Sequence, residues 1–457
     1  MRSDPVKQIL IPSTRNPVGA QLTLFQRANT KSIIYASSIS DGLQDLFSAT
    51  KHMKRFQVPE LETFFHSGDV PHYCTKARES GEAEIPFAVC HTSGSSGNPK
   101  PITWTKDFIL NSDSAHSLPT DQGPSATMVL CKDQRVLSLL PLFHAGGFSL
   151  SLYPALYDST IVLGHPDVPV TADYVIRLLT TDNITAMLAP PSILEDMTKI
   201  AGAIDRLARL EHVAYGGGPL HAQVGSVLAP RLKHLFSYIG ATEYGWFHLA
   251  TGGSDRWDCL RFFDNVGYHF EVVSEQMFEL VIVKNAATDH FHGIFETFPT
   301  INRYRTKDLY SPVAEHPGWM RYQGRTDDLI VLSKGEKINP IPMENIVRSH
   351  EMIRDALIVG DYRADASLLL ELVDSETLSR TQKADLIDRV WPIIQEANKL
   401  APGFARIRRP FILFTTPSKP FQRAAKGTVQ RQLSVQSYAK ELEELYSTAR
   451  RQPPPKL

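Results

Sequence analysis

The chain has 457 residues, of which 42% are hydrophobic and 21% charged. This length and composition are typical of a folded globular protein with about three domains' worth of core, and they exclude a mainly disordered chain. The formal net charge of -1 gives no reason to expect nucleic acid or an anionic membrane as the main partner, because both attract basic surfaces.

The cysteines and the N-terminal residues limit the class of protein further. Residues 1–13 contain too short an apolar stretch for a signal peptide, and no apolar run approaches the roughly 18 residues that span a bilayer. The cysteines are far apart and form no CxxC pair, which argues against a disulfide framework or a structural zinc site. We therefore expect a cytoplasmic protein with a small-molecule partner. The cysteines are Cys74, Cys90, Cys131 and Cys259.

A glycine- and serine-rich segment, HTSGSSGNPK, follows the apolar run 85–90. Its small residues let the backbone turn tightly and direct N–H groups and hydroxyls at phosphate oxygens, which predicts a triphosphate site. The Walker A loop is a poor match, because Pro99 replaces the glycine before Lys100 and Pro101 replaces the magnesium-binding hydroxyl residue. A solvated linker is the other interpretation. The loop positions are Thr92, Ser93, Gly94, Ser95, Ser96 and Gly97.

From about residue 125 the sequence alternates short apolar runs with helical periods, which is typical of βα units. Residues 184–189 and 212–215 are predicted to be strands, the second ending at three glycines. Between these two strands a helix is expected, and Ser192 with Glu195 three residues later predicts a capping box at its start.

Two acidic residues follow this region in segments that suit a nucleotide. Glu243 comes after a glycine turn in FSYIGATEYG, where a carboxylate can hold magnesium on bound ATP, because strand ends host ligands in α/β sheets. Asp308, in YRTKDLY, can accept hydrogen bonds from both ribose hydroxyls, and Arg325 offers a fixed cation for ribose or phosphate. Taken singly, each residue also fits an ordinary turn acid or a surface ion pair.

Beyond about residue 325 the pattern changes to that of a compact α+β unit. A long helix is predicted over 380–399, and strands over 356–359, 367–373 and 411–414. The end of the chain after about Tyr446 is rich in proline and charge, so we expect it to be frayed.

The order of these segments resembles the adenylate-forming (AMP-binding) superfamily, which contains acyl-CoA synthetases and the adenylation domains of nonribosomal peptide synthetases. HTSGSSGNPK resembles its phosphate loop, PLFHAGG its substrate-side segment, YGGGPL its glycine turn, GATE its magnesium segment, YRTKDL its ribose segment and GRTDD its hinge. The PKPI after the loop, the lysine in YRTKDL and the KGTVQR near the end are most similar to adenylation domains of fungal synthetase-like carboxylic acid reductases and related quinone-forming enzymes.

The resemblance implies an α/β fold with a large N-terminal domain of βα subdomains around mixed sheets and a small, mobile α+β C-terminal domain. We expect these domains at residues 1–323 and 324–440, with a tail at 441–457. Because the phosphate loop already appears at residue 92, we expect the large domain to be shortened at its start, leaving an exposed sheet edge or apolar patch. No carrier or reductase motif is recognised after Leu433.

The resemblance also implies a role for each motif. The phosphate loop would hold the leaving pyrophosphate, Glu243 the magnesium ion and Asp308 the ribose, with Asp327 as the hinge. A lysine near the end would bridge the substrate carboxylate and the α-phosphate. Lys426 is the candidate and Lys419 the alternative, because the spacing around Lys426 departs from the family pattern. Catalytic roles are implied for Lys426, Thr92, Glu243 and His144. Nucleotide contacts are implied for Thr92, Ser93, Gly94, Ser95, Ser96, Gly97, Lys100, Gly216, Gly217, Gly218, Tyr238, Ile239, Gly240, Ala241, Thr242, Asp308, Arg325 and Lys426.

The same resemblance outlines the acid pocket. Amino-acid-activating relatives usually place an aspartate near the position of Phe143 or His144, and this sequence has none there. An aryl, keto or aliphatic acid is therefore expected rather than an α-amino acid, although His144 also fits a core histidine. Where an adenine-stacking aromatic is expected, the sequence has Ile239, with Tyr238 next to it. The implied walls are His144, Gly146, Gly147, Phe148, Ala189, Pro190, Gly217 and Ile239.

The function implied is ATP- and magnesium-dependent activation of a carboxylic acid to an acyl-adenylate with release of pyrophosphate. Rotation at Asp327 would then admit a thiol, from coenzyme A or a separate phosphopantetheine carrier protein. The alternative is a truncated, non-catalytic relative that serves as a binding or scaffolding protein.

Overall fold

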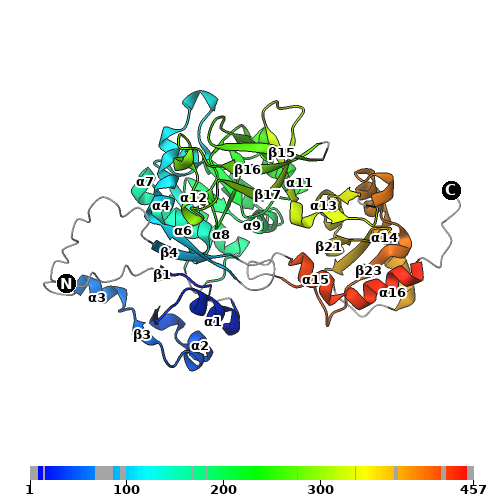
Figure 1. Cartoon of the computed structure of the whole chain (residues 1–457), viewed down its shortest axis with the longest axis horizontal. Coiled ribbons are helices and arrows are strands. Elements are labelled where there is room, and N and C mark those ends of the chain that lie inside the picture. Colours follow the sequence, from blue (N-terminus) through cyan, green and yellow to red (C-terminus); the bar gives the residue numbers. More distant parts are fainter. Residues whose placement is uncertain are drawn as a thin grey trace.

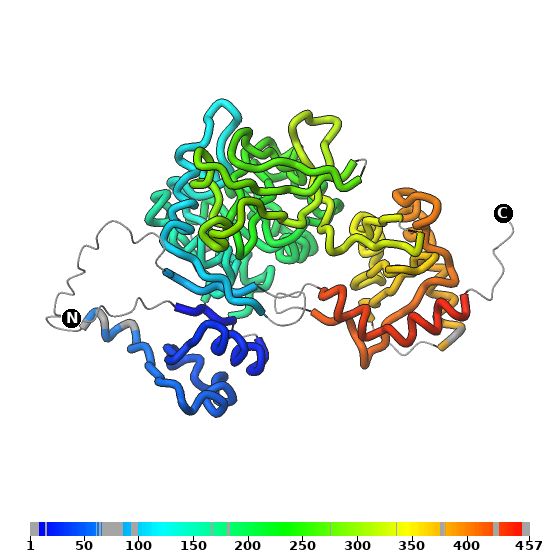
Figure 2. The backbone as a smooth tube through the Cα atoms, in the orientation of Figure 1, coloured from blue at the N-terminus to red at the C-terminus, as the bar shows by residue number. Residues whose placement is uncertain are grey.

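The structure, a computed structural model, consists of a large body and a smaller one that begins near residue 325 (Figures 1 and 2). None of the helices in the described part of the chain is long and apolar enough to cross a membrane. The residues described are 9–13, 16–66, 86–92, 99–165, 168–181, 183–274, 276–334, 336–374, 379–423 and 429–449.

A five-stranded parallel sheet forms the centre of the large body, in the order β10-β9-β8-β6-β7. Its strands at 186–189 and 212–216 confirm two predicted strands, and all four residues of β8 are buried, as expected where helices cover both faces of a sheet. β9 and β10 end at Gly216 and Tyr238, on the edge where α/β sheets bind ligands. The strands are β6 (Arg135–Ser138), β7 (Thr160–Leu163), β8 (Ala186–Ala189), β9 (His212–Gly216) and β10 (Leu235–Tyr238); the helices beside them include α6 (Ala145–Leu152), α8 (Ala172–Thr181), α9 (Pro191–Met197) and α11 (Ala222–Leu228).

A second, six-stranded sheet packs its aromatic side chains into the same core. Its neighbouring strands are all antiparallel, in the order β13-β14-β18-β17-β16-β15. Phe262 contacts Phe270 and Tyr310 edge to face, an arrangement that aromatic rings favour. The strands are β13 (Leu249–Ala250), β14 (Cys259–Phe262), β15 (Tyr268–Ser274), β16 (Met277–Val283), β17 (Arg303–Pro312) and β18 (Met320–Arg325).

The first part of the described chain adds a three-stranded sheet and a small unit beside it. β1 (Ile9–Leu10), β4 (Pro86–His91) and β5 (Pro101–Thr105) form the sheet, while β2 (Ser32–Tyr35) and β3 (Lys54–Gln57) pair in parallel among α1 (Val18–Arg27), α2 (Gln44–Ala49) and α3 (Leu61–His66). Ile34 and Phe56 lie opposite each other in this pair, and both side chains are exposed, by 66% and 53%.

The small body has the predicted α+β composition. β21 (Ile353–Val359), β22 (Ser367–Leu372) and β23 (Ile412–Phe414) form one sheet, and α14 (Arg380–Lys399) covers the predicted helix. α16 (Ala439–Ala449) crosses the expected tail boundary at 441, because the Tyr446 hydroxyl donates to Ser367 Oγ at 2.9 Å and to the Val359 carbonyl at 3.2 Å. This helix therefore belongs to the small body. Also present are α13 (Ile341–Arg348), α15 (Arg431–Ser437) and the hairpin β19–β20 (Ile330–Val331 and Lys337–Ile338).

The predicted capping box at Ser192 is wrong. α9 begins at Pro191, with Pro190 as its N-cap and no side-chain cap, so Ser192 already lies within the helix. Proline favours the first helical position because its fixed φ suits a helix and its missing N–H is not needed there. A capping box does form at α14, between Ser379 and Gln382.

Candidate active site

The predicted phosphate loop joins two antiparallel strands. β4 ends at His91, which pairs with Pro101 at the start of β5. The Thr92 N–H donates to the Lys100 carbonyl at 3.0 Å, and the Lys100 N–H to Thr92 Oγ1 at 3.4 Å. Thr92 and Lys100 therefore close the base of a hairpin loop. The positions between them, Ser93, Gly94, Ser95, Ser96 and Gly97, lie outside the described residues.

The predicted magnesium segment is the tip of a second hairpin. β11 (Gly240–Ala241) pairs with β12 (Gly245–Trp246), so that 242–244 form the turn. Gly245 has φ +76°, and a side chain on Gly240 would come within 2.6 Å of the Gly245 carbonyl oxygen. Both positions therefore require glycine.

Two side chains from other segments hold this turn. Trp104 Nε1, on β5, donates to the Thr242 carbonyl at 2.8 Å. Thr297 Oγ1, at the end of α12 (Ile294–Thr297), donates to the Glu243 carbonyl at 2.8 Å. These bonds fix the backbone of Glu243, whose side chain is partly exposed, and join the phosphate-loop hairpin to the predicted magnesium segment.

Asp308, in the predicted ribose segment, contacts the turn formed by residues 242–244. It lies opposite Arg325 in the pairing of β17 with β18, and the Tyr244 hydroxyl donates to its Oδ2 at 3.4 Å. Burial raises the pKa of Asp308 to about 6; the Arg325 charge and the Tyr244 hydrogen bond oppose this rise, and the Glu243 charge adds to it. Perturbed carboxyl groups of this kind are frequent at functional sites.

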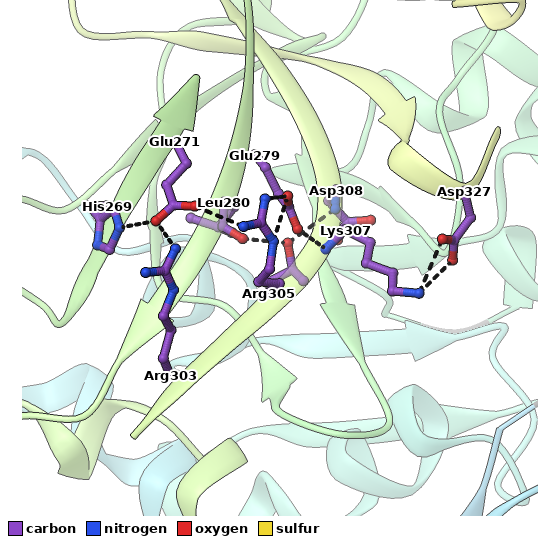
Figure 3. A network of polar contacts seen from close by, with 10 residues as sticks. His269, Glu271, Glu279, Leu280, Arg303, Arg305, Lys307, Asp308 and Asp327 are labelled. Carbon is purple, nitrogen blue, oxygen red and sulfur yellow. Dashed lines mark hydrogen bonds and ion pairs between the residues drawn. The ribbon is translucent and has the colours of Figure 1, made fainter. Parts of the chain in front are cut away.

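The predicted hinge residue lies beside this strand. Asp327 is in the short turn Thr326–Asp328, and the Lys307 ammonium lies 3.1 Å from each of its carboxylate oxygens (Figure 3). Arg325 Nη2 lies 3.9 Å from the same carboxylate. Lys307 therefore joins the predicted ribose segment to the predicted hinge.

Of the two lysine candidates, Lys419 lies in the described part of the chain. Lys419 donates to Glu441 at 2.6 Å and its ammonium lies 4.4 Å from the centre of the Tyr438 ring, so its charge is already engaged inside the small body. Lys426 lies outside the described residues. Arg431, which follows it, has a side chain that is 16% exposed and paired with the buried Glu344.

The predicted acid-pocket residues lie at the ends of β8, β9 and β10 and at the start of α6. Gly217 has φ +83° and is exposed together with Gly218, so the glycine turn leaves the sheet immediately after β9. His144 is the N-cap residue of α6 and is only partly buried, unlike a core histidine. Pro190 and Phe148 are also partly exposed, and Phe148 packs against Trp104.

Three of the predicted site residues are buried, and the contacts expected of two of them, the side chains of Tyr238 and Ala189, need correction. Tyr238 is 1% exposed and its hydroxyl bonds Thr127, so its ring cannot stack on a base. Ala189 is 0% exposed and lies in the core beneath the site. A side chain on Gly147 would come within 2.3 Å of the Pro141 carbonyl oxygen, so this glycine permits the close packing of α6. The partly exposed Ile239 remains as the side chain beside the predicted adenine position.

Sequence reasoning missed Trp246. Its ring lies 4.5 Å from that of Tyr238, and a side chain on Gly146 or Gly240 would come within 2.8 Å of the indole. Its buried Nε1 has no hydrogen-bond partner among the described residues. The indole therefore fills the space that these two predicted site glycines leave. The available signal was a large aromatic residue three positions after Glu243.

Comparison with known families agrees with this arrangement. Residues 16–271 match the family described as AMP-binding enzyme, and residues 327–450 match the AMP-binding enzyme C-terminal domain. The chain belongs to the AMP-binding enzyme family.

Two curated relatives share sequence along nearly the whole chain. A carboxylic acid reductase of Neurospora crassa is 32% identical over 448 residues, which cover 96% of this chain and 42% of that protein. The adenylate-forming reductase Nps10 of Heterobasidion annosum is 29% identical over 464 residues, which cover 95% and 41%. The chain thus spans about two fifths of the length of these relatives.

Solved structures confirm the predicted fold class. An anthranilate CoA ligase in complex with anthranoyl-AMP superposes with a TM-score of 0.70 at 15% identity, covering 96% of this chain and 83% of that one. An O-succinylbenzoate CoA synthetase of Bacillus subtilis, in complex with ATP and magnesium, gives 0.66 at 16% identity, covering 93% and 83%. At these identities the likeness establishes the fold alone.

Proposed function

We propose that this chain activates a carboxylic acid by forming an acyl-adenylate from ATP, with release of pyrophosphate. The observation that carries the proposal is the convergence of segments far apart in sequence. Trp104 bonds the phosphate-loop hairpin to the Thr242 carbonyl, and Tyr244 bonds the same turn to Asp308. Asp308 in turn lies opposite Arg325. These contacts link the base of the phosphate-loop hairpin, the predicted magnesium segment and the predicted ribose segment, which supports the proposal.

The arrangement suits a nucleotide with its metal. Ionised Asp308 can accept hydrogen bonds from both ribose hydroxyls, while Arg325 provides a cation beside it. The partly exposed Glu243 carboxylate, on a backbone fixed from two sides, is an oxygen donor of the kind Mg²⁺ prefers. When bound there, magnesium would neutralise charge on the phosphates. The loop between Thr92 and Lys100 would direct its N–H groups at the phosphates.

The reaction would be an attack by a substrate carboxylate oxygen on the α-phosphorus, with pyrophosphate as the leaving group. Negative charge grows on the α-phosphate in the transition state, and preorganised cations stabilise it. Lys426 is proposed for this role. Because it lies beyond Asp327, rotation there would withdraw it and admit a thiol, either of coenzyme A or of a phosphopantetheine carrier.

The acid is proposed to be aryl, keto or aliphatic. His144 stands at the start of α6, where the sequence offers no carboxylate for an α-amine. The Trp246 indole against Gly146 gives this region an apolar surface, which suits a side chain without charge. The name of one relative, carboxylic acid reductase, supports a carboxylic acid substrate.

Carboxylate-dependent exchange of pyrophosphate into ATP tests the proposal. We expect exchange with at least one member of a panel of aryl, keto and aliphatic acids. Lys426→Ala should lower the rate by about a hundredfold or more, because one charge-stabilising donor is lost. Lys440→Ala, which removes an exposed lysine of α16, is the matched control and should leave the rate unchanged. A folded protein that shows no exchange with any acid would instead support the binding or scaffolding alternative.

A further inference from the structure

The strand that carries Asp308 has a bulge, and Lys307 is at its centre. Val281 of β16 pairs with Arg305 and Glu279 pairs with Leu309, so residues 306–308 stand opposite a single residue. Lys307 has φ +67°, in the left-handed region that disfavours any residue with a Cβ. A residue other than glycine stays in this region only when its surroundings hold it there.

A buried carboxylate holds this backbone conformation. Glu279 is 2% exposed, and its Oε1 accepts the Lys307 N–H at 3.2 Å. Its Oε2 accepts the Arg305 Nε–H at 3.0 Å, so the buried charge is paired. Inside the bulge, Thr306 Oγ1 accepts the Asp308 N–H at 3.1 Å and donates to the Leu280 carbonyl at 2.9 Å. These bonds hold the backbone of the bulge in one conformation, which sets the direction of the Lys307 Cα–Cβ bond.

That direction leads to the hinge. Figure 3 shows the Lys307 side chain extended from β17 to Asp327, with its ammonium 3.1 Å from both carboxylate oxygens. About half of each side chain is exposed, 51% for Lys307 and 49% for Asp327. After Asp327 the chain enters β19 and the small body. Lys307 therefore precedes Asp308 in the backbone of β17, while its ammonium group lies at Asp327, the predicted hinge residue.

We propose that Lys307 is a positioning residue, which holds Asp327 and the adjoining hinge in the orientation seen here, and that Glu279 fixes Lys307 for this purpose. The inference rests on the proposed function in one respect, since it takes Asp327 to be the hinge between two domain orientations. An exposed ion pair is weak and screened by salt. When two domain orientations have similar free energies, however, a weak interaction that is present in only one of them changes the ratio of their populations several-fold.

Hydrogen–deuterium exchange of the peptide covering residues 326–332 tests this without any catalytic readout. In Lys307→Met, which keeps the aliphatic stem, we expect these amides to exchange two- to fivefold faster at low salt. Lys307→Gly should do the same without loss of thermal stability, because glycine adopts this φ freely. Lys284→Met is the matched control, since the Lys284 ammonium bonds the Pro299 carbonyl at 3.4 Å, away from the hinge.

Salt and charge reversal make the test specific. Raising the salt concentration should speed hinge exchange in the wild type and leave Lys307→Met unchanged. Lys307→Glu alone should speed it, and combining it with Asp327→Lys should restore it to within twofold of the wild type. Unchanged hinge exchange in Lys307→Met, or no restoration in the reversed pair, would overturn the proposal. If the wild type shows no ATP–pyrophosphate exchange with any acid, the proposed function is refuted. The hydrogen–deuterium exchange result at residues 326–332 would still hold, because it does not depend on catalysis.

Discussion

The carboxyl group of Asp308 lies where burial disfavours its charged form. Its pKa of about 6 lies above the ordinary value of 3.8, mainly because of burial. Between about pH 4 and 6 the folded state therefore binds more protons than the unfolded state, so this residue lowers stability as pH rises through that window. Above pH 6 the destabilisation is fully present, and the carboxyl group is then the ionised acceptor that we propose for the ribose.

Asp308→Asn should accordingly raise stability and weaken nucleotide binding. At pH 7 we expect a gain of about 1 kcal/mol in the free energy of unfolding, after allowance for partial exposure. Wild-type affinity for ATP, measured by titration calorimetry, should fall below about pH 6 as the carboxyl takes up a proton, and this acid limb should be missing in Asp308→Asn. Asp121→Asn, at an exposed acid, is the control. A variant that binds ATP as tightly as the wild type would contradict the ribose role.

Single residues were predictable where a motif marks them and not where distant segments meet. The positions of Glu243, Asp308 and Arg325 followed from local patterns, and the structure brings them together. Trp104 and Thr297 bond the Thr242 and Glu243 carbonyls from 138 and 54 residues away. Such contacts depend on the packing of whole elements, which local periodicity does not encode.

Among the elements, those with strong periodicity or clear ends were predicted and irregular ones were not. The helix over 380–399 and the strand at 186–189 follow from sustained patterns bounded by breakers. The six-stranded antiparallel sheet did not emerge, because its strands are interrupted by bulges, as at Lys307, and mix charged with aromatic residues. A bulge shifts the alternation of faces on which strand prediction depends.

One ion pair with a buried carboxylate joins three elements of the small body. Arg431, at the start of α15, donates to Glu344 of α13 at 2.6 Å and to the Ile358 carbonyl of β21 at 3.0 Å. Glu344 is 2% exposed and also accepts the Ile358 N–H at 2.6 Å. Removing only the arginine would leave a buried carboxylate without its counter-ion, which is the costly case for such pairs.

Arg431→Met should therefore lower the free energy of unfolding of the small body by about 3 to 5 kcal/mol. Adding Glu344→Gln should recover part of this loss, because the unpaired charge is removed. Urea unfolding followed by the fluorescence of Trp391 measures both variants. Lys399→Met, which breaks an exposed pair with Glu396, is the control and should change stability by less than about 0.5 kcal/mol. Equal effects of Arg431→Met and Lys399→Met would contradict this account.

The core of the large body contains two histidines that the fold keeps neutral. His248 and His292 are 4% and 3% exposed, and burial lowers their pKa values to about 3 and about 4, from an ordinary value of 6.5. Below pH 6.5 the unfolded chain takes up protons that the folded chain does not, so stability falls as pH falls. The change is about 1.4 kcal/mol per pH unit for each histidine.

We therefore expect the large body to lose about 2 kcal/mol per buried histidine between pH 6.5 and 5, measured by urea unfolding at each pH. His292→Gln should be less stable at pH 7, since it loses packing and the bond to the Val266 carbonyl, but its stability should depend less steeply on pH. Ser114→Ala removes the 2.9 Å bond to His248 and keeps both titrating groups, so it should lower stability without flattening the slope. If both variants keep the wild-type slope, the acid sensitivity arises elsewhere in the molecule.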